Sequence, residues 1–283
     1  QTWTLEEAAI HYGIFPAKFP VYPDLLEAAG YHVGFTGKGW APGDYRGGGR
    51  SRNPAGPEYN DRYLTAPQGT KVSNRDYAAN FHDFLAARPD GAAFCFWYGA
   101  HEPHRPYAEG EGVRAGKDPS EPRPPRFLPD DPVVRSDLAD YAYEVEWFDS
   151  QLGRILERLD AAGELDNTLV IVTSDNGMPF PRVKGQMYEQ DFNLPLAVRW
   201  PRKIPGGRVV HDLVSFTDFA PTMLEAAGVD PAPGMSGSSL LPLLRSHEEG
   251  FVDASRDRVY MGRENHDLGR EGDRGYPVRC VRT

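Results

Sequence analysis

The feature that most constrains this fold is a set of three apolar segments, each of which leads directly to polar side chains. Residues 31–36 lead to Gly-Lys-Gly, residues 92–99 lead after one alanine to His-Glu-Pro-His, and residues 168–175 end in Ser-Asp before Asn-Gly. Apolar runs of this length, rich in β-branched and aromatic residues, predict buried strands. Because parallel sheets place their active sites at the carboxyl ends of the strands, we expect these polar residues to share one site.

Amphipathic helical patterns separate the predicted strands. Helical spacing is present in residues 22–30, 74–88, 133–163 and 217–228. Gly30 and Gly163 fit the position just after a helix, and Ser73 or Asn74 is placed to cap the second helix. The longest pattern repeats apolar side chains at every third or fourth position: Leu138, Tyr141, Val145, Phe148, Leu152, Ile155 and Leu159.

Two further strands are predicted at residues 194–200 and 257–262. The alternation of helices and strands predicts an α/β fold, in which a mostly parallel sheet is sandwiched by helices. Residues 41–70 and 105–132 are rich in Gly, Pro and charged side chains and predict long loops. We expect substrate specificity to come from these two loops.

Composition excludes some classes of protein. The chain has 283 residues and a net charge of −10, which argues against non-specific binding to nucleic acid or anionic lipid. No apolar run reaches the roughly 18 residues that a transmembrane helix needs. The two cysteines, Cys95 and Cys280, form neither a disulfide framework nor a zinc-type spacing. The oligomeric state is not evident from the sequence.

The pair Asp175-Asn176 follows the strand predicted at residues 168–175. A carboxylate and an amide side by side offer two hard oxygen ligands, which suit Ca²⁺ or Mg²⁺. An ordinary turn capped by these side chains is the alternative, because Asp-Asn-Gly is common in turns. The tetrapeptide Ser174-Asp175-Asn176-Gly177 alone leaves both interpretations open.

The loop His101-Glu102-Pro103-His104-Arg105-Pro106 brings two imidazoles and a guanidinium together. A histidine here could act as a general acid or could hydrogen-bond an anionic substrate. Zinc binding lacks partners, because the chain has no H-E-x-x-H helix. A surface loop with incidental histidines is the alternative.

Three cations follow predicted strand ends: Lys38 between two glycines, and Arg182 and Lys184 shortly after the Asp-Asn pair. Taken alone, each is better explained as a solvated side chain or a charged loop than as part of a site. Together with the histidines and the metal-type ligands they describe what a sulfuryl or phosphoryl oxyanion requires, since a metal and cations offset the charge of the transferring group.

The segments DLLEAAGYHVGFTGKGW and GAHEPHRPY, the long helix leading to VTSDNG, and LPLAVRWP resemble the sulfatases of the alkaline phosphatase superfamily. The detail SDNGMPFPRVK is most similar to the N-sulfoglucosamine sulfohydrolase (heparan N-sulfatase) branch. The resemblance covers nearly all of the chain. It implies a sulfuric ester or sulfamate hydrolase that acts on a sulfated carbohydrate or another small sulfate ester and works in the periplasm, outside the cell or in the lysosome.

The resemblance also implies roles for individual residues. Lys38, His104 and Lys184 match the catalytic residues that hold the sulfate and assist departure of the leaving group. Asp175 and Asn176 match two ligands of the family's single Ca²⁺ ion. Two additional substrate contacts are expected from His101 and Arg182.

Some family features are missing from this sequence. The family's nucleophile is a formylglycine made in a C/S-x-P/A-x-R motif, and neither Cys95 nor Cys280 lies in one. The family's paired metal-binding aspartates have no match, since Asp130-Asp131 lies in a Pro-rich loop. Trp40 stands where many sulfatases have a histidine.

We therefore expect a fragment whose formylglycine lies upstream of Gln1 and which is inactive alone. Residues 1–245 are predicted to be a truncated catalytic domain and residues 246–283 the beginning of a C-terminal subdomain. Two alternatives stay open. One is a phosphoester or phosphonate hydrolase of the same superfamily, for which His211-Asp212 is the one tempting extra ligand pair. The other is a non-catalytic binding homologue.

Overall fold

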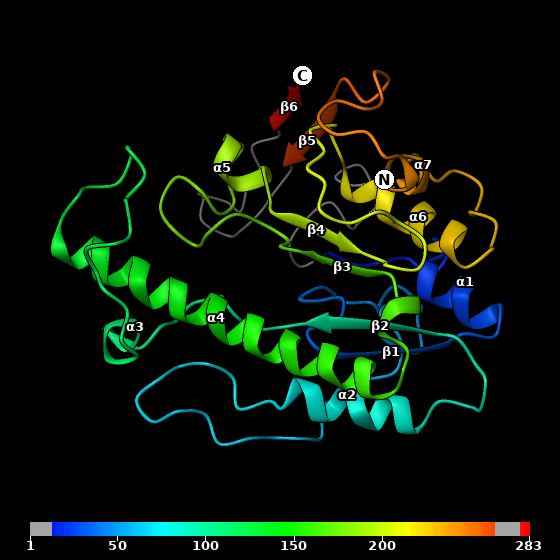
Figure 1. The fold of residues 1–283 in the computed structure, drawn as a ribbon, viewed down its shortest axis with the longest axis horizontal. Helices are drawn as coiled ribbons and strands as arrows, with labels where there is room; N and C mark the ends of the chain where they lie inside the picture. The colour runs from blue at the N-terminus through cyan, green and yellow to red at the C-terminus, as the bar shows by residue number, and fades with distance from the viewer. Residues whose placement is uncertain (1–12, 264–277) are drawn as a thin grey trace.

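The computed structural model describes residues 13–263 and 278–283. The described residues form a layered α/β fold (Figure 1). In chain order the elements are α1 (Tyr22–Ala28), β1 (His32–Gly37), α2 (Tyr77–Ala86), β2 (Phe94–Gly99), α3 (Glu111–Arg114), α4 (Pro132–Ala161), β3 (Val170–Thr173), α5 (Glu189–Phe192), β4 (Leu196–Arg199), α6 (Phe219–Ala226), α7 (Leu241–Arg245), β5 (Val259–Arg263) and β6 (Val278–Arg282).

Strands β1 and β2 form a parallel pair with helices on both faces. Side chains of β2 alternate between the two faces, as the pleat requires. Phe94, Phe96 and Tyr98 pack on one face against the core formed by α2 and α4. Cys95 packs on the other face with Leu26 of α1. The predicted α/β fold, with a sheet between helices, is confirmed.

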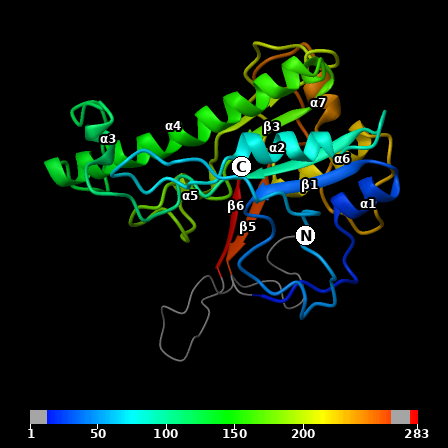
Figure 2. The same cartoon turned by 90° about the horizontal axis from the view of Figure 1, so that it is seen from below.

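The larger core lies between α2, α4 and β2. Tyr77, Phe81 and Phe84 of α2 meet Ile155 and Leu159 of α4, and all five are at most 5% exposed. The ring of Phe84 lies 4.6 Å from that of Phe96. A closely packed aromatic cluster of this kind fixes the sheet relative to the long helix. Figure 2 shows α3 beside the N-terminal half of α4 and α2 toward its C-terminal half.

Strands β3 and β4 differ from the mostly parallel arrangement that we expected. They pair antiparallel, with Thr173 opposite Leu196 and Val170 opposite Arg199. The connection from Thr173 to Leu196 contains only the short helix α5 and re-enters the sheet at the same end of the strands that it left. Parallel neighbours need a crossover that carries the chain to the opposite end of the strands, so this connection gives an antiparallel pair.

The C-terminal strands β5 and β6 form a further antiparallel ladder, with Met261 opposite Cys280. The strand predicted at residues 257–262 is therefore present, shifted by one or two residues. The division of the chain at residue 245 stays a prediction.

The helix ends follow local sequence signals, with one correction. Gly30 and Gly163 have φ values of 91° and 69°, as expected for glycines just after helices. Helix α2 is capped by Asp76, whose side chain accepts the Ala79 N–H at 3.0 Å, and not by Ser73 or Asn74. Residues 41–70 contain no helix or strand, as predicted. Among the described helices, none is long and apolar enough to cross a membrane.

Candidate active site

One cavity of about 1590 Å³ collects most of the predicted site residues at the strand ends. Its wall includes six of the seven: Lys38, His101, His104, Asp175, Asn176 and Lys184. These residues come from three separate loops, after β1, after β2 and after β3. The expectation that polar residues following different strands share one site is therefore met.

Lys38 is held by close backbone contacts at the ends of β1 and β2. Its N–H donates to the Gly99 carbonyl at 2.6 Å, and its carbonyl accepts the Trp97 indole N–H at 2.9 Å. A Cβ on Gly37 would lie 2.0 Å from the Gly99 oxygen, so only glycine fits there. Buried Asn60 accepts the Gly37 N–H at 2.7 Å and donates to the Gly37 carbonyl. These contacts fix the strand end that carries the lysine.

The loop that carries both histidines is anchored by Tyr77 and Glu102. The Tyr77 hydroxyl accepts the His101 N–H at 3.0 Å and donates to the Glu102 carboxylate at 2.9 Å. The other Glu102 oxygen accepts the Ser73 N–H at 2.6 Å. Burial raises the pKa of Tyr77 well above its ordinary value, so this hydroxyl remains a donor. The histidine loop is thereby tied to the N-terminal end of α2.

The two histidines differ in their electrostatic setting. Partial desolvation of its ring in the cavity wall, together with nearby Lys38, lowers the pKa of His101. His104 lies with Nδ1 2.6 Å from the Arg105 carbonyl. A carbonyl can only accept, so Nδ1 must be the donor and Nε2 is left to exchange a proton. His104 therefore has the tautomer that a general acid or base needs.

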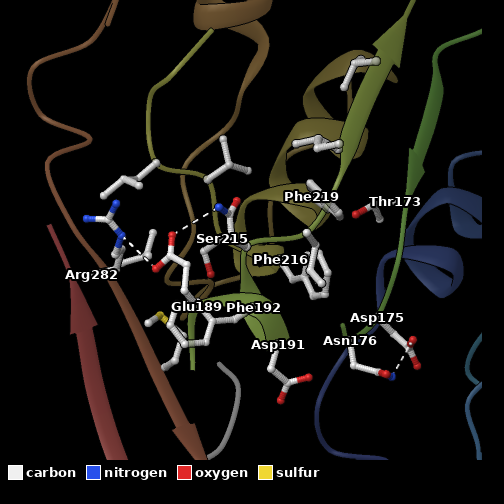
Figure 3. Close-up of a pocket in the computed structure, with 18 of the residues that line it drawn as sticks. Thr173, Asp175, Asn176, Glu189, Asp191, Phe192, Ser215, Phe216, Phe219 and Arg282 are labelled. Carbon is white, nitrogen blue, oxygen red and sulfur yellow. Dashed lines mark hydrogen bonds and ion pairs between the residues drawn. The ribbon is translucent and has the colours of Figure 1, made fainter. Parts of the chain in front are cut away.

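Asp175 and Asn176 lie side by side just beyond the end of β3 (Figure 3). The Asn176 amide donates to Asp175 at 2.8 Å, which leaves the Asn176 Oδ1 and one Asp175 oxygen open. Both side chains offer the hard oxygens that Ca²⁺ prefers. Within residues 13–263 and 278–283, however, no group of three or more His, Cys, Asp or Glu side chains could hold a metal ion. The pair fits as part of a Ca²⁺ site that these residues alone do not complete.

Lys184 and Arg182 are placed differently, although they are two residues apart. Lys184 lines the cavity, and its pKa is lowered by desolvation, while Asp175 acts in the opposite sense. Buried Val183 anchors the turn between them. Arg182 has a φ of 67°, is absent from the cavity wall, and lies over the exposed Tyr188 ring at 5.8 Å. The turn at Arg182 thus separates two cations that the sequence placed together.

Several cavity residues were missed by the sequence reasoning. The wall also contains Lys71, Glu102, Glu144 and Asp191. Burial and the nearby Glu111 and Glu102 carboxylates raise the pKa of Glu144 to about 8. Glu144 lies three residues after Tyr141 and four before Phe148, so an acid within the predicted apolar stripe was the available signal.

Other sequence candidates have structural roles. The Arg105 guanidinium forms a two-point ion pair with Asp137, which fixes its orientation. Asp212 accepts the Val252 and Asp253 N–H groups and so clamps a loop. Burial raises the pKa of Cys95 to about 12, which makes its thiol a poor nucleophile. The Trp40 ring stacks on Phe15 at 5.3 Å.

A cationic, histidine-bearing cavity beside two side-chain oxygen donors has the chemistry that binding of an oxyanion ester requires. Residues 6–229 match the family model described as sulfatase, so the chain belongs to the sulfatase family. Residues 183–279 match a second model, described as N-sulphoglucosamine sulphohydrolase, C-terminal. That match confirms the branch which SDNGMPFPRVK resembles.

Known proteins show how far the similarity extends. An ulvan-active sulfatase of Formosa agariphila is 30% identical over 161 residues, which are 57% of this chain and 27% of the relative. Human N-sulphoglucosamine sulphohydrolase is 33% identical over 175 residues, 58% of this chain and 33% of the relative. A phosphonate monoester hydrolase from Silicibacter pomeroyi superposes with a TM-score of 0.66 at 17% identity, over 92% of this chain and 67% of that one. The chain thus spans about a third or less of the length of these curated relatives, and the structural likeness shows the fold alone.

Proposed function

We propose that the protein is a sulfuric ester or sulfamate hydrolase that acts on a sulfated sugar. The observation that supports this most is the meeting of Lys38, Lys184, His104 and the pair Asp175-Asn176 in one cavity of a sulfatase-family chain. The name of the human relative, N-sulphoglucosamine sulphohydrolase, supports a sugar substrate. Family resemblance further leads us to propose that the protein acts in an exported or lysosomal compartment.

In this proposal the chain's own residues bind the sulfate and manage the leaving-group proton. Lys38 and Lys184 hold the oxyanion, because positioned cations offset the charge that grows in the transition state. Desolvation lowers the pKa of Lys184, and nearby Lys38 acts in the same sense. An anion between the two lysines would relieve their repulsion. In its imidazolium form, with protons on both ring nitrogens, His104 would give the Nε2 proton to the departing oxygen or nitrogen.

Asp175 and Asn176 would hold the Ca²⁺ ion that the family uses, and that ion would neutralise further sulfate charge. The nucleophile in this proposal is a formylglycine, and no residue of the sequence lies in the C/S-x-P/A-x-R motif that produces one. The described side chains therefore act as the sulfate-holding and proton-donating part of the site.

Binding of inorganic sulfate and of glucosamine N-sulfate, measured by calorimetry, tests this proposal without requiring turnover. Lys184→Ala and Lys38→Ala should each weaken binding about 10- to 100-fold, because a hydrogen bond to a charged group contributes about 1.5–3 kcal/mol. Arg182→Ala is the matched control, because it removes a cation two residues away that does not reach the cavity. Equal affinity of wild type and Lys184→Ala would contradict the proposal.

Phosphonate hydrolysis is the second candidate, since the same fold carries that activity in the Silicibacter pomeroyi enzyme. A phosphonate monoester and a matched sulfate ester should be compared as competitors for the cavity. The sulfate ester is expected to bind more tightly. Tighter binding of the phosphonate would favour phosphonate hydrolysis over sulfate ester hydrolysis, with the same residues forming the site.

A further inference from the structure

Three glutamates form a buried acidic cluster behind the histidine loop. Glu102 is 6% exposed, Glu111 is 1% exposed and Glu144 is 2% exposed. They come from three segments: the loop after β2, helix α3 and helix α4. Glu102 and Glu144 also border the active-site cavity. Buried carboxyl groups that lie this close together must balance their charge in some way.

Within residues 13–263 and 278–283, the cluster has few hydrogen-bond donors and no ion-paired cation. Glu102 accepts two hydrogen bonds, from the Ser73 N–H and the Tyr77 hydroxyl. Glu111 accepts one, from the Lys71 N–H at 2.8 Å, on its Oε2 atom. No ion pair within the described parts of the chain reaches any of the three carboxyl groups. Their charge is therefore not balanced by a neighbouring side chain.

Two oxygens of the cluster are buried and have no hydrogen-bond partner among the described residues: Oε1 of Glu111 and Oε1 of Glu144. The two carboxyl groups lie within hydrogen-bonding reach of each other. Two ionised carboxylates at such a distance repel, whereas one shared proton turns the repulsion into a short, strong hydrogen bond. A shared proton therefore gives a hydrogen bond to two carboxyl groups that each have a buried oxygen without a partner.

The proton belongs on Glu144 rather than on its neighbours. Glu102 has two donors that stabilise its ionised form, and Glu111 has a backbone donor. The other titratable groups that face Glu144 are the phenols of Tyr107 and Tyr143, and burial raises the pKa of both. Glu144 is the member with no donor, so neutralising it costs the least.

We propose that Glu144 is a neutral carboxylic acid that donates its proton to Glu111, and that this proton keeps Glu102 and the histidine loop in place. Glu144 is then a positioning residue, which acts through Glu102 and Tyr77 on His101. The statement about the histidine loop rests on the proposed function, but the shared proton does not.

Loss of the proton has a defined structural consequence. An ionised Glu144 repels the Glu102 and Glu111 carboxylates in a setting that water does not screen. The Glu102 carboxylate accepts the hydrogen bond from the Tyr77 hydroxyl, and that hydroxyl accepts the His101 N–H. Deprotonation of Glu144 should therefore loosen the loop that presents His101 and His104.

The dependence of stability on pH follows from the same proton. Glu144 has a raised folded pKa of about 8, while an unfolded glutamate has a pKa of about 4.3. Between these values the folded state binds more protons than the unfolded state, so stability falls as pH rises. Replacing Glu144 with glutamine should remove this loss of stability with rising pH.

The test compares Glu144→Gln with Glu157→Gln, a control that changes an exposed glutamate on the same helix. Carbon NMR of labelled glutamate carboxyl groups in the full chain should show one residue that titrates several pH units above the rest, and its signal should vanish in Glu144→Gln. The melting temperature of Glu144→Gln should match the wild type near pH 5 and exceed it increasingly toward pH 8. Glu157→Gln should follow the wild type throughout.

The histidine loop supplies the second measurement. Ring signals of His101 and His104 should change near pH 8 in the wild type and should not change there in Glu144→Gln. A Glu144 carboxyl that titrates near pH 4 would overturn the shared proton, whatever the protein binds. Normal high-pH titration with unmoved histidine signals would overturn the positioning role. Failure of sulfate to bind, with the titration as expected, would reject only the proposed function.

Discussion

The two halves of helix α4 bury different kinds of side chain, although they belong to one continuous helix. The C-terminal half buries Ile155 and Leu159 among the aromatic side chains of α2 and β2. The N-terminal half buries Asp140 and Glu144, at 2% exposed each, against α3 and the loops around the cavity. The C-terminal half therefore contributes mainly apolar burial against α2 and β2, whereas the N-terminal half, which also buries Leu138 and Ala139, places two buried acids beside α3 and the cavity.

The contact with α3 shows how the polar half is built. Asp140 accepts the N–H groups of Gly110 and Gly112, both at 2.8 Å, at the start of α3. A Cβ on Gly112 would lie 2.2 Å from the Ala139 carbonyl oxygen, so α3 lies directly on the backbone of α4. An acidic side chain is buried here in place of an apolar one. The reason is that the backbone N–H groups at the start of α3 lie against α4 and need a hydrogen-bond acceptor. Figure 2 shows α3 at this end of the helix.

The largest effect should come from the apolar half. Leu159→Ala should lower the free energy of unfolding by about 2–5 kcal/mol, because it removes a buried side chain and leaves a cavity in the aromatic core. Leu159 is 3% exposed. Urea unfolding monitored by circular dichroism measures the loss. The control is Glu157→Ala on the exposed side of the same turn, which should change stability by less than about 0.5 kcal/mol. A similar loss in both variants would mean that this half is not a packed core.

A smaller effect should come from the polar half. Asp140→Asn keeps one acceptor oxygen and leaves one buried N–H at the start of α3 without a partner, which should cost about 1–3 kcal/mol. Amide hydrogen exchange should locate the damage, with faster exchange at Gly110 or Gly112 and unchanged protection in α2. Equal loss of protection in α2 and α3 would show that the two halves do not behave separately.

Much of the fold could be predicted from patterns within single segments. Apolar runs and glycine positions located β1, β2, β3 and the ends of α1 and α4. Pairing direction could not be predicted in this way. The β3–β4 pair is antiparallel because of where its connection returns, and that depends on contacts between segments rather than on either strand's own sequence.

The buried face of α4 was predicted only in part. Leu138, Ile155 and Leu159 of the apolar stripe are buried, but Val145 is 37% exposed while neighbouring Glu144 is 2% exposed. The rule that apolar residues face inward fails at Val145 because the groups packed against this turn of the helix are polar. The sequence located Lys38 and Asp175, which follow strands, but missed Glu144, which lies within a helix, in the cavity wall. Glu102 was missed although it follows β2, because the histidines beside it drew the functional interpretation.

The smallest effect should come from an ion pair of the C-terminal half, where Arg154 of α4 meets Asp76 at the start of α2. The Asp76 carboxylate accepts the Ala79 N–H and pairs with Arg154, each at 3.0 Å. Asp76→Asn keeps an acceptor for the cap and removes only the charge, so it should cost about 0.2–1 kcal/mol. Asp76→Ala removes both contacts and should cost about 0.5–2 kcal/mol.

The dependence on pH separates the ion pair from the cap. Burial acts to raise the pKa of Asp76, but Arg154 and the Ala79 N–H outweigh it and hold the pKa below its ordinary value. A lowered folded pKa stabilises the protein above the unfolded pKa of about 3.9, and this contribution is lost as pH falls through the folded value. The difference in melting temperature between wild type and Asp76→Asn should therefore be constant near neutral pH and shrink below about pH 4, whereas exposed Asp90→Asn should show no such trend. A difference that stays unchanged down to pH 2 would mean that Arg154 does not join α4 to α2 through charge.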